Sequence, residues 1–146
     1  MKTEKGVTIV AYKESNRNTR FLVLKRTKNW DGWELPKGHL EGDDYEKTVK
    51  LEIEEEAGVL EESIESMESM EQVLEWTFEQ DGEEIKREYR CYLVKVSEDT
   101  YVDTSRNPHE EHDSGYFFDL DDATALLTYE NQQELLEQVA ENLQVT

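Results

Sequence analysis

Three glutamates near the middle of the chain have a spacing that could create a metal-binding face. Glu52, Glu55 and Glu56 lie at i, i+3 and i+4 in a segment whose apolar residues recur every four positions, which predicts an amphipathic helix. On such a helix the three carboxylates project from one flank, where like charges repel. Glu56 also falls inside the edge of the apolar stripe, where a carboxylate loses hydration. The pattern fits either a solvated acidic face or a site for a hard divalent cation, which would offset both costs.

The helix that must position these carboxylates has recognisable start and stop signals. Asp43 and Asp44 are residue types that cap a helix N-terminus, and Gly58 is typical of the position after a helix. The apolar stripe consists of Tyr45, Val49, Ile53 and Ala57. The preceding residues 30–38 are rich in glycine and aromatic side chains. We therefore expect a loop followed by a helix over residues 44–57.

The segment from Gly38 to Val59 resembles the signature motif of the Nudix hydrolase family, G-x5-E-x7-R-E-U-x-E-E-x-G-U, in which U is a bulky apolar residue. The second half is matched by Glu52-Ile53-Glu54-Glu55-Glu56-Ala57-Gly58-Val59. The run Pro36-Lys37-Gly38-His39 and the pair Glu111-His112 are similar to the diadenosine tetraphosphate (bis(5′-nucleosyl)-tetraphosphate) hydrolase branch of that family. So many matching positions argue against chance, and the resemblance extends over most of the chain.

The chain departs from the family pattern in three places. The spacing between Gly38 and the next motif acid is one residue short, and that acid is Asp43 rather than glutamate. Leu51 stands where the family has arginine, and Lys50 cannot substitute because it points about 100° away on a helix. In the family this arginine helps to hold the motif's loop and carboxylates. The pattern therefore also allows a catalytically weakened nucleotide-binding sensor.

The resemblance implies a Mg²⁺-dependent pyrophosphohydrolase, with Mn²⁺ as a substitute ion, that cleaves nucleoside diphosphates linked to another moiety. The tetraphosphate branch favours dinucleoside polyphosphates, such as diadenosine tetraphosphate cleaved to ATP and AMP. Nucleoside triphosphates, nucleotide sugars and RNA 5′ ends are the alternative substrates. In this chemistry water attacks phosphorus, while divalent ions neutralise phosphate oxygens and lower the pKa of the water.

The resemblance also implies roles for individual residues. Glu52, Glu55 and Glu56 would bind the metal, and the backbone of Gly38 would approach the metal and the phosphates. The predicted catalytic carboxylates are Glu55, Glu52 and Glu111. The general base would be Glu55, Glu56 or a loop carboxylate, for which Glu111 is favoured, although a solvated loop acid is the alternative.

Four further residues are predicted to contact the substrate, namely Lys37, His39, Arg87 and Tyr129. Lys37 and Arg87 could bind phosphate, but a surface ion pair explains Arg87 equally well. His39 either contacts phosphate or shapes the loop. Tyr129 either stacks on a nucleobase or packs at the rim of the core.

Other chemically versatile side chains favour structural roles. Trp30 and Trp33 are expected to pack, with base stacking as the alternative. His109 and His112 lack the helical H-E-x-x-H pattern of zinc proteases, so zinc is not expected. Cys91, the single cysteine, lies in a strand-like run and is expected to be a buried thiol.

The charge of the chain restricts its partners. Its 146 residues include 16 Lys+Arg and 36 Asp+Glu, giving a formal net charge of −20 at pH 7. This charge excludes bare electrostatic attraction to nucleic acids or anionic membranes. The expected partner is a small-molecule nucleotide, whose phosphates would need a metal ion or a local basic patch. The excess of acidic residues outside the motif is typical of adaptation to high salt and predicts a halophilic source.

The remaining pattern predicts one α/β domain over residues 1–146. Strands are expected over 7–12, 21–24, 70–79, 84–96 and 116–118, with a hairpin turn at Asp81-Gly82, a short helix capped by Asp121 and a closing helix over 130–143. This order indicates a mixed sheet, and the resemblance implies a Nudix-type α/β/α sandwich. Without an apolar run of about 20 residues or a signal peptide, the expected location is the cytoplasm. The oligomeric state stays open.

Overall fold

A seven-stranded mixed sheet forms the centre of the computed structural model, which describes residues 1–28, 31–106 and 112–145. The strands are β1 (Lys2–Ser15), β2 (Asn18–Arg26), β3 (Gly32–Glu34), β4 (Lys37–His39), β5 (Ile64–Gln80), β6 (Glu83–Val96) and β7 (His112–Phe118). Their order is β3-β2-β1-β6-β5, with β4 paired to β1 and β7 paired to β2. β1 and β6 run parallel, whereas the other pairs are antiparallel. The predicted mixed sheet is therefore confirmed.

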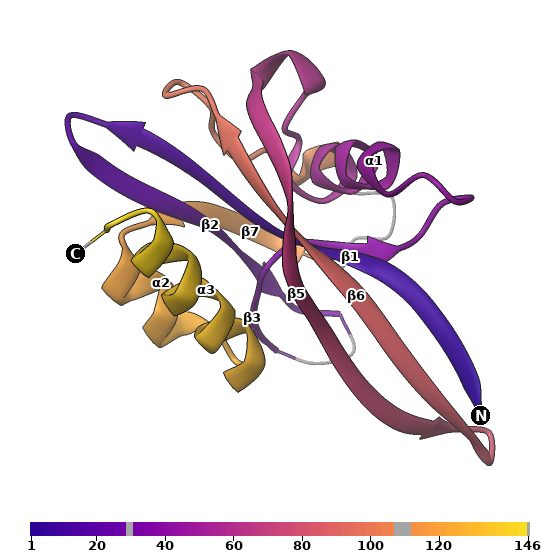
Figure 1. Ribbon diagram of the computed structural model, residues 1–146. Coiled ribbons are helices and arrows are strands. Elements are labelled where there is room, and N and C mark those ends of the chain that lie inside the picture. Colours follow the sequence, from indigo (N-terminus) through magenta and orange to yellow (C-terminus); the bar gives the residue numbers. More distant parts are fainter. Residues whose placement is uncertain (29–30, 107–111, 146) are drawn as a thin grey trace.

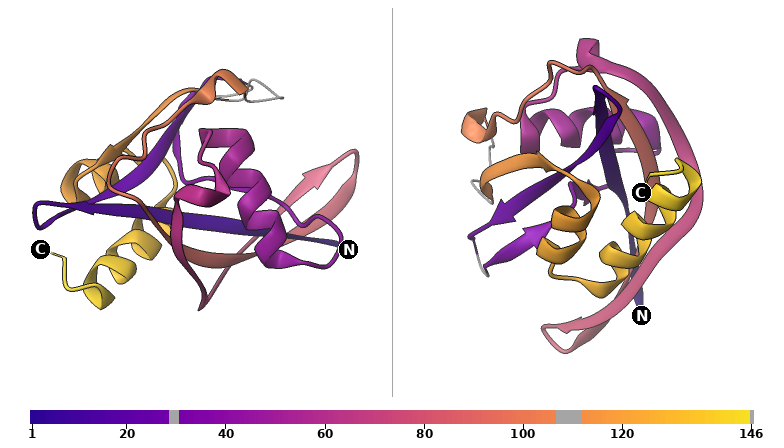
Figure 2. Two further views of the ribbon diagram at one scale, coloured as in Figure 1. Left: turned by 90° about the horizontal axis from the view of Figure 1, so that it is seen from above. Right: turned by 90° about the vertical axis from the view of Figure 1, so that its left-hand side faces the viewer.

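Helices cover both faces of this sheet. α1 (Tyr45–Ala57) lies on one side, and α2 (Leu120–Leu126) and α3 (Glu130–Asn142) lie on the other (Figure 1). The turned views show the same three layers (Figure 2). Two short 3₁₀ turns, Glu61–Ser63 and Thr104–Arg106, complete the regular structure of the described residues. The predicted α/β/α sandwich is confirmed.

The alternation of β1 creates two separate cores. Val7, Ile9 and Ala11 face the α1 side, whereas Val10 and Tyr12 face α2 and α3, because successive side chains of a strand point to opposite faces. The first core is completed from α1 by Val49, Ile53 and Ala57, and the second from α3 by Leu135, Leu136 and Val139. All eleven are buried, so both helices are fixed firmly against the strands between them.

The strands β1 and β2 separate beyond their hairpin, and β3 and β4 fill the space between them. β3 pairs with the end of β2, while β4 pairs with residues 6–8 of β1. The N–H of Ile9 donates to the carbonyl of Pro36 at 2.8 Å, which holds the link between the two short strands against β1. The loop expected over residues 30–38 is thus wrong for residues 32–34 and 37–38, which belong to the sheet. This arrangement places Gly38, the first residue of the motif, beside α1.

The ends of α1 follow the sequence signals. The side chain of Asp44 accepts a hydrogen bond from the N–H of Lys47 at 3.1 Å and caps the helix. Gly58 adopts a left-handed conformation with φ of 70°, and a Cβ there would collide with the carbonyl of Asp103. For α2 the predicted cap is wrong, because Asp119 rather than Asp121 accepts the capping bond.

Cys91 is fully buried in the core beside α2 and α3, as predicted. Burial raises the pKa of its thiol to about 12, which keeps it protonated and unreactive at neutral pH. Among the described residues, no helix combines the length and the apolar content needed to span a bilayer.

Candidate active site

Two residues of β4 lie directly against the glutamates of α1. The N–H of Lys37 donates to Oε2 of Glu56 at 3.3 Å. Gly38 passes over the carboxylate of Glu52, since a Cβ at Gly38 would collide with its carbon and both oxygens. Glu56 is only 7% exposed, so it does face the core side of the helix. The missing side chain of Gly38 therefore lets the main chain approach a partly buried acidic face.

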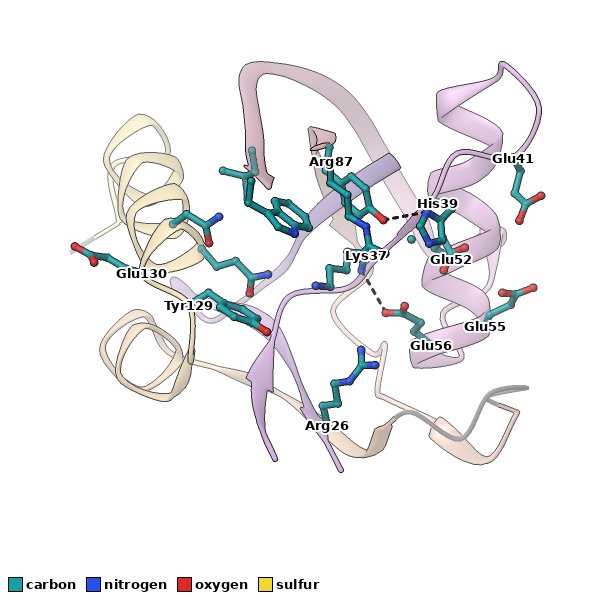
Figure 3. A pocket seen from close by; sticks show the side chains of 16 residues that line it. Arg26, Lys37, His39, Glu41, Glu52, Glu55, Glu56, Arg87, Tyr129 and Glu130 are labelled. Atoms are coloured by element: carbon teal, nitrogen blue, oxygen red, sulfur yellow. Dashed lines mark hydrogen bonds between the residues drawn. The ribbon is translucent and has the colours of Figure 1, made fainter. Parts of the chain in front are cut away.

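These contacts form one wall of a pocket of about 760 Å³. Five carboxylates line it, those of Glu41, Glu52, Glu55 and Glu56 on the α1 side and that of Glu130 across from them, together with three basic side chains, those of Arg26, Lys37 and Arg87. Figure 3 shows the glutamates on the α1 side and Tyr129 with Glu130 on the opposite side. In a chain of net charge −20, this pocket supplies the local basic groups that a phosphate ligand requires.

The pocket brings together every predicted site residue that the structure describes. These are Lys37, Gly38, His39, Glu52, Glu55, Glu56, Arg87 and Tyr129. Glu111 lies outside the described residues, as do Glu110, His109 and Trp30. Trp33 packs edge-on against Phe118 at 5.7 Å between ring centroids, which supports its packing role.

Two aromatic rings approach the ammonium group of Lys37. Its Nζ lies 5.4 Å from the ring centre of Trp76 on β5 and 5.5 Å from that of Tyr129. Both distances are within the range of a cation–π attraction. Tyr129 immediately precedes α3 and remains 40% exposed, so its ring is accessible to a ligand. Trp76 was not predicted as a site residue, although its position in the alternating run with Leu74 and Phe78 indicates one shared face of β5.

His39 is braced by a buried tyrosine. Its Nδ1 lies 3.3 Å from the hydroxyl of Tyr89, whose ring packs against Trp76 at 5.0 Å. Burial raises the pKa of Tyr89 to about 12, so its hydroxyl stays protonated at neutral pH. His39 itself is exposed and lines the pocket, so its position is compatible with both predicted roles, contact with phosphate and shaping of the loop.

Arg87 forms the ion pair that the sequence allowed. Its Nε donates to Oε1 of Glu4 at 3.0 Å, and its guanidinium lies 4.6 Å from the ring centre of Phe78. The hydrogen bond from Arg87 lowers the pKa of the Glu4 carboxyl. Because Arg87 also lines the pocket, the ion pair orients a cation at its edge.

A basic residue that the sequence analysis missed also lines the pocket. Arg26, at the end of β2, has its Nη1 3.5 Å from Oε1 of the buried Glu34, and the Nε2 of His112 is 3.8 Å from the same oxygen. Burial alone would raise the pKa of Glu34, but His112, Lys37 and Arg26 lower it below its ordinary value. The only available sequence signal was a basic pair following a strand, which is too common to identify a site.

The donors of the acidic wall suit a hard divalent cation. No three histidine, cysteine or acidic side chains among the described residues already converge as a closed metal cluster. Mg²⁺ does not require one, because it is usually held by one or two carboxylates and keeps several waters or phosphate oxygens. The carboxylate of Glu52 lies directly against the backbone of Gly38, and both residues line the pocket. The residues therefore fit such an ion.

Comparisons with solved structures give several similar folds. The Ap4A hydrolase of C. elegans, solved as a binary complex, is 24% identical with a TM-score of 0.74, over 96% of this chain and 97% of that one. The NUDIX domain of Shewanella oneidensis NrtR, solved with ADP ribose, is 16% identical with a TM-score of 0.75, over 98% and 90%. The E. coli dihydroneopterin triphosphate pyrophosphohydrolase is 17% identical with a TM-score of 0.75, over 97% and 99%. At these identities the likeness establishes the fold alone.

A comparison with curated protein sequences gives no significant match. The family model of the NUDIX domain, however, matches residues 2–139, which is nearly the whole chain. Nudix hydrolases generally use divalent metals such as Mg²⁺ and act on small nucleotide substrates. The match includes the helix whose glutamates line the pocket, and it supports the assignment as a hydrolase. The chain therefore belongs to the Nudix family.

Proposed function

We propose that this protein is a Mg²⁺-dependent pyrophosphohydrolase of dinucleoside polyphosphates, acting on compounds such as diadenosine tetraphosphate. One observation carries the proposal: five carboxylates and three basic side chains line a single pocket in a chain of strongly negative charge. Such a pairing suits a ligand that brings several phosphates and is bound together with cations. The Pro36-Lys37-Gly38-His39 run favours the tetraphosphate branch over triphosphate, nucleotide-sugar and RNA substrates.

The acidic wall would hold the metal. Glu52, Glu55 and Glu56 would supply carboxylate oxygens, with Mn²⁺ as a substitute ion, and Gly38 would supply its backbone. Once bound, the ion neutralises phosphate oxygens and makes a water molecule more acidic. Glu55 or Glu56 would accept the proton of the attacking water, and Glu111 is the corresponding proposal from the loop. Attack at phosphorus then breaks one phosphoanhydride bond and yields ATP and AMP.

The other walls would orient the substrate. Lys37 and Arg26 would contact phosphate oxygens, and Arg87, already oriented by Glu4, would add a third positive charge. Tyr129 and Trp76 present aromatic surfaces on two elements that line the pocket, and either ring suits stacking on a nucleobase. His39 would reach phosphate from the edge of β4.

A competition between substrates tests this assignment. With Mg²⁺ present, diadenosine tetraphosphate is expected to have a kcat/KM at least about tenfold above those of ATP, ADP-ribose and a capped RNA 5′ end, because only it joins two nucleosides through four phosphates. Chromatography of the products should give equal amounts of ATP and AMP. A higher kcat/KM for another member of the panel would reassign the substrate, and binding without turnover of any member would favour the sensor allowed by Leu51.

The excess acid supports a second prediction, about salt. We propose that the protein works in a high-salt cytoplasm, because like charges on its surface repel less when the Debye length falls from about 10 Å at 0.1 M to about 3 Å at 1 M salt. The melting temperature measured at pH 7 should therefore rise over this range of KCl. At pH 5, where carboxylates begin to be protonated, the rise should be smaller. A melting temperature that falls with KCl at pH 7 would contradict the proposal.

A further inference from the structure

The hydroxyl of Thr48, in the first half of α1, is buried and bonded on both sides. Thr48 has no exposed surface. Its Oγ1 accepts a hydrogen bond from the N–H of Glu41 at 2.9 Å and donates one to the carbonyl of Asp44 at 2.9 Å. One hydroxyl thus joins the β4–α1 loop, residues 40–44, to the helix that follows it. Neither the motif resemblance nor the apolar stripe of α1 gives this threonine a role.

Thr48 extends the stripe of α1 residues that contacts β4 to the loop that follows β4. Thr48, Glu52 and Glu56 are spaced by four and therefore lie on one stripe of the helix. Along this stripe Glu56 accepts from Lys37, Glu52 lies below Gly38, and Thr48 accepts from Glu41. Two of these three contacts use carboxylates that the proposed function assigns to the metal. The third contact, that of Thr48, uses an uncharged hydroxyl, so it does not depend on a bound ion.

The loop has a particular need for this contact. The N–H of Leu40 donates to the carbonyl of Lys5 at 2.9 Å, and the next N–H, that of Glu41, donates to Thr48. The chain then turns at Gly42, where φ is 63° and an added Cβ would meet no atom within 4 Å. The loop therefore projects away from the protein immediately after the Thr48 bond. Leu51, which replaces the motif arginine, has no polar group that could secure it.

We propose that Thr48 is a positioning residue that fixes the β4–α1 loop. It thereby keeps Gly38 and Glu52 in the relative positions that a divalent cation would need. The inference rests on the proposed function, since it assumes that Glu52 and Glu56 bind metal. It explains how this chain supports a shortened motif loop without the arginine. The side chain acts through the N–H of Glu41 and touches neither substrate nor metal.

Thr48→Val and Thr48→Ser separate the hydroxyl from the shape of the side chain. Valine keeps the branched shape but loses both hydrogen bonds, whereas serine keeps the hydroxyl. Thr48→Val should weaken Mn²⁺ binding, measured by electron paramagnetic resonance without substrate, by about tenfold. It should also speed hydrogen exchange at the Glu41 amide. Thr48→Ser should stay within about twofold of wild type in both, and Thr77→Val, an exposed threonine on β5, serves as the matched control.

The outcomes distinguish this inference from the proposed function. If the wild type does not bind Mn²⁺, the proposed function fails. If the wild type binds but Thr48→Val binds equally well, or Thr48→Ser is weakened as much as Thr48→Val, only the role of Thr48 is overturned. Should Thr48→Val not fold, Thr48→Ala removes the same hydroxyl while keeping a good helix former, and the same loss of Mn²⁺ affinity is expected.

Discussion

Replacing Glu56 by glutamine is expected to lower Mg²⁺-dependent turnover by about 10²- to 10³-fold while the protein stays folded. Glutamine has nearly the size of glutamate, and its carbonyl can still accept the N–H of Lys37, which now donates to Glu56 at 3.3 Å. The substitution removes only the negative charge that a divalent cation would need. Initial rates over a range of Mg²⁺ concentrations, together with the melting temperature, measure both effects.

Glu54→Gln provides the matched control for this substitution. Glu54 lies on the same helix but is exposed and does not line the pocket. Its rate should remain within about twofold of wild type because its side chain lies outside the pocket, and its stability should change by about 0.5 kcal/mol or less. Equal rates for Glu56→Gln and wild type would show that the acidic face of α1 is not the metal site. Equal losses in both variants would point to total charge rather than to position.

Replacing Gly38 by alanine should abolish most of the activity for a steric reason. The new Cβ would collide with the carboxylate of Glu52. Because that carboxylate is the end of a flexible side chain, it can swing away at little cost in stability, but it then leaves the position below β4. We expect Mn²⁺ affinity and turnover to fall by about 10- to 100-fold, as they do when support around a metal ligand is lost. Calorimetric titration with Mn²⁺ and initial rates measure the two losses.

Gly42→Ala separates this effect from a general effect of alanine in the loop. At Gly42 the added Cβ meets no atom within 4 Å, but φ is 63°, so the expected cost is about 1 kcal/mol of stability from backbone strain. Its Mn²⁺ affinity should stay within about threefold of wild type. In the Gly38→Ala background, shortening the colliding side chain by Glu52→Asp should recover part of the affinity. If Gly38→Ala bound Mn²⁺ as tightly as wild type, the close approach of β4 to Glu52 would have no role in the metal site.

The element most accurately predicted from the sequence is α1. Its apolar stripe, its cap at Asp44 and its stop at Gly58 are all local signals, and they agree with one another. The direction of Glu56 could also be predicted, because it follows from the helical period alone. For the same reason, the residues that the motif resemblance placed on α1 do line one pocket.

β5 shows where a periodic signal fails. The strand begins at Ile64 rather than at the predicted residue 70. Its more buried residues follow a spacing of three at Ile64, Met67 and Met70, and only later alternate. The pairing with β6 shifts register between Ile64 and Ser66 and again between Ser69 and Val73. Such bulges add residues that break a period of two, so the pattern of the first half does not resemble a strand.

The walls of the pocket opposite α1 could not be assembled from the sequence. Arg26 comes from β2, Trp76 from β5 and Gln132 from α3, so their meeting depends on the order of strands and on the packing of α3. The Oε1 of Gln132 accepts the N–H of Leu35 at 2.9 Å across 97 residues, a contact that no local pattern predicts. β3 and β4 were missed because three residues are too few to show alternation.

The most direct test of the central claim is the dependence of hydrolysis on a divalent metal. Purified protein, first treated with EDTA, would be incubated with diadenosine tetraphosphate while Mg²⁺ is titrated back and the products are separated by ion-exchange chromatography. The proposed mechanism predicts no product in EDTA and equal amounts of ATP and AMP as Mg²⁺ is restored, with little recovery in Glu56→Gln. Hydrolysis that persists in EDTA, or that is equally restored in Glu56→Gln, would contradict it.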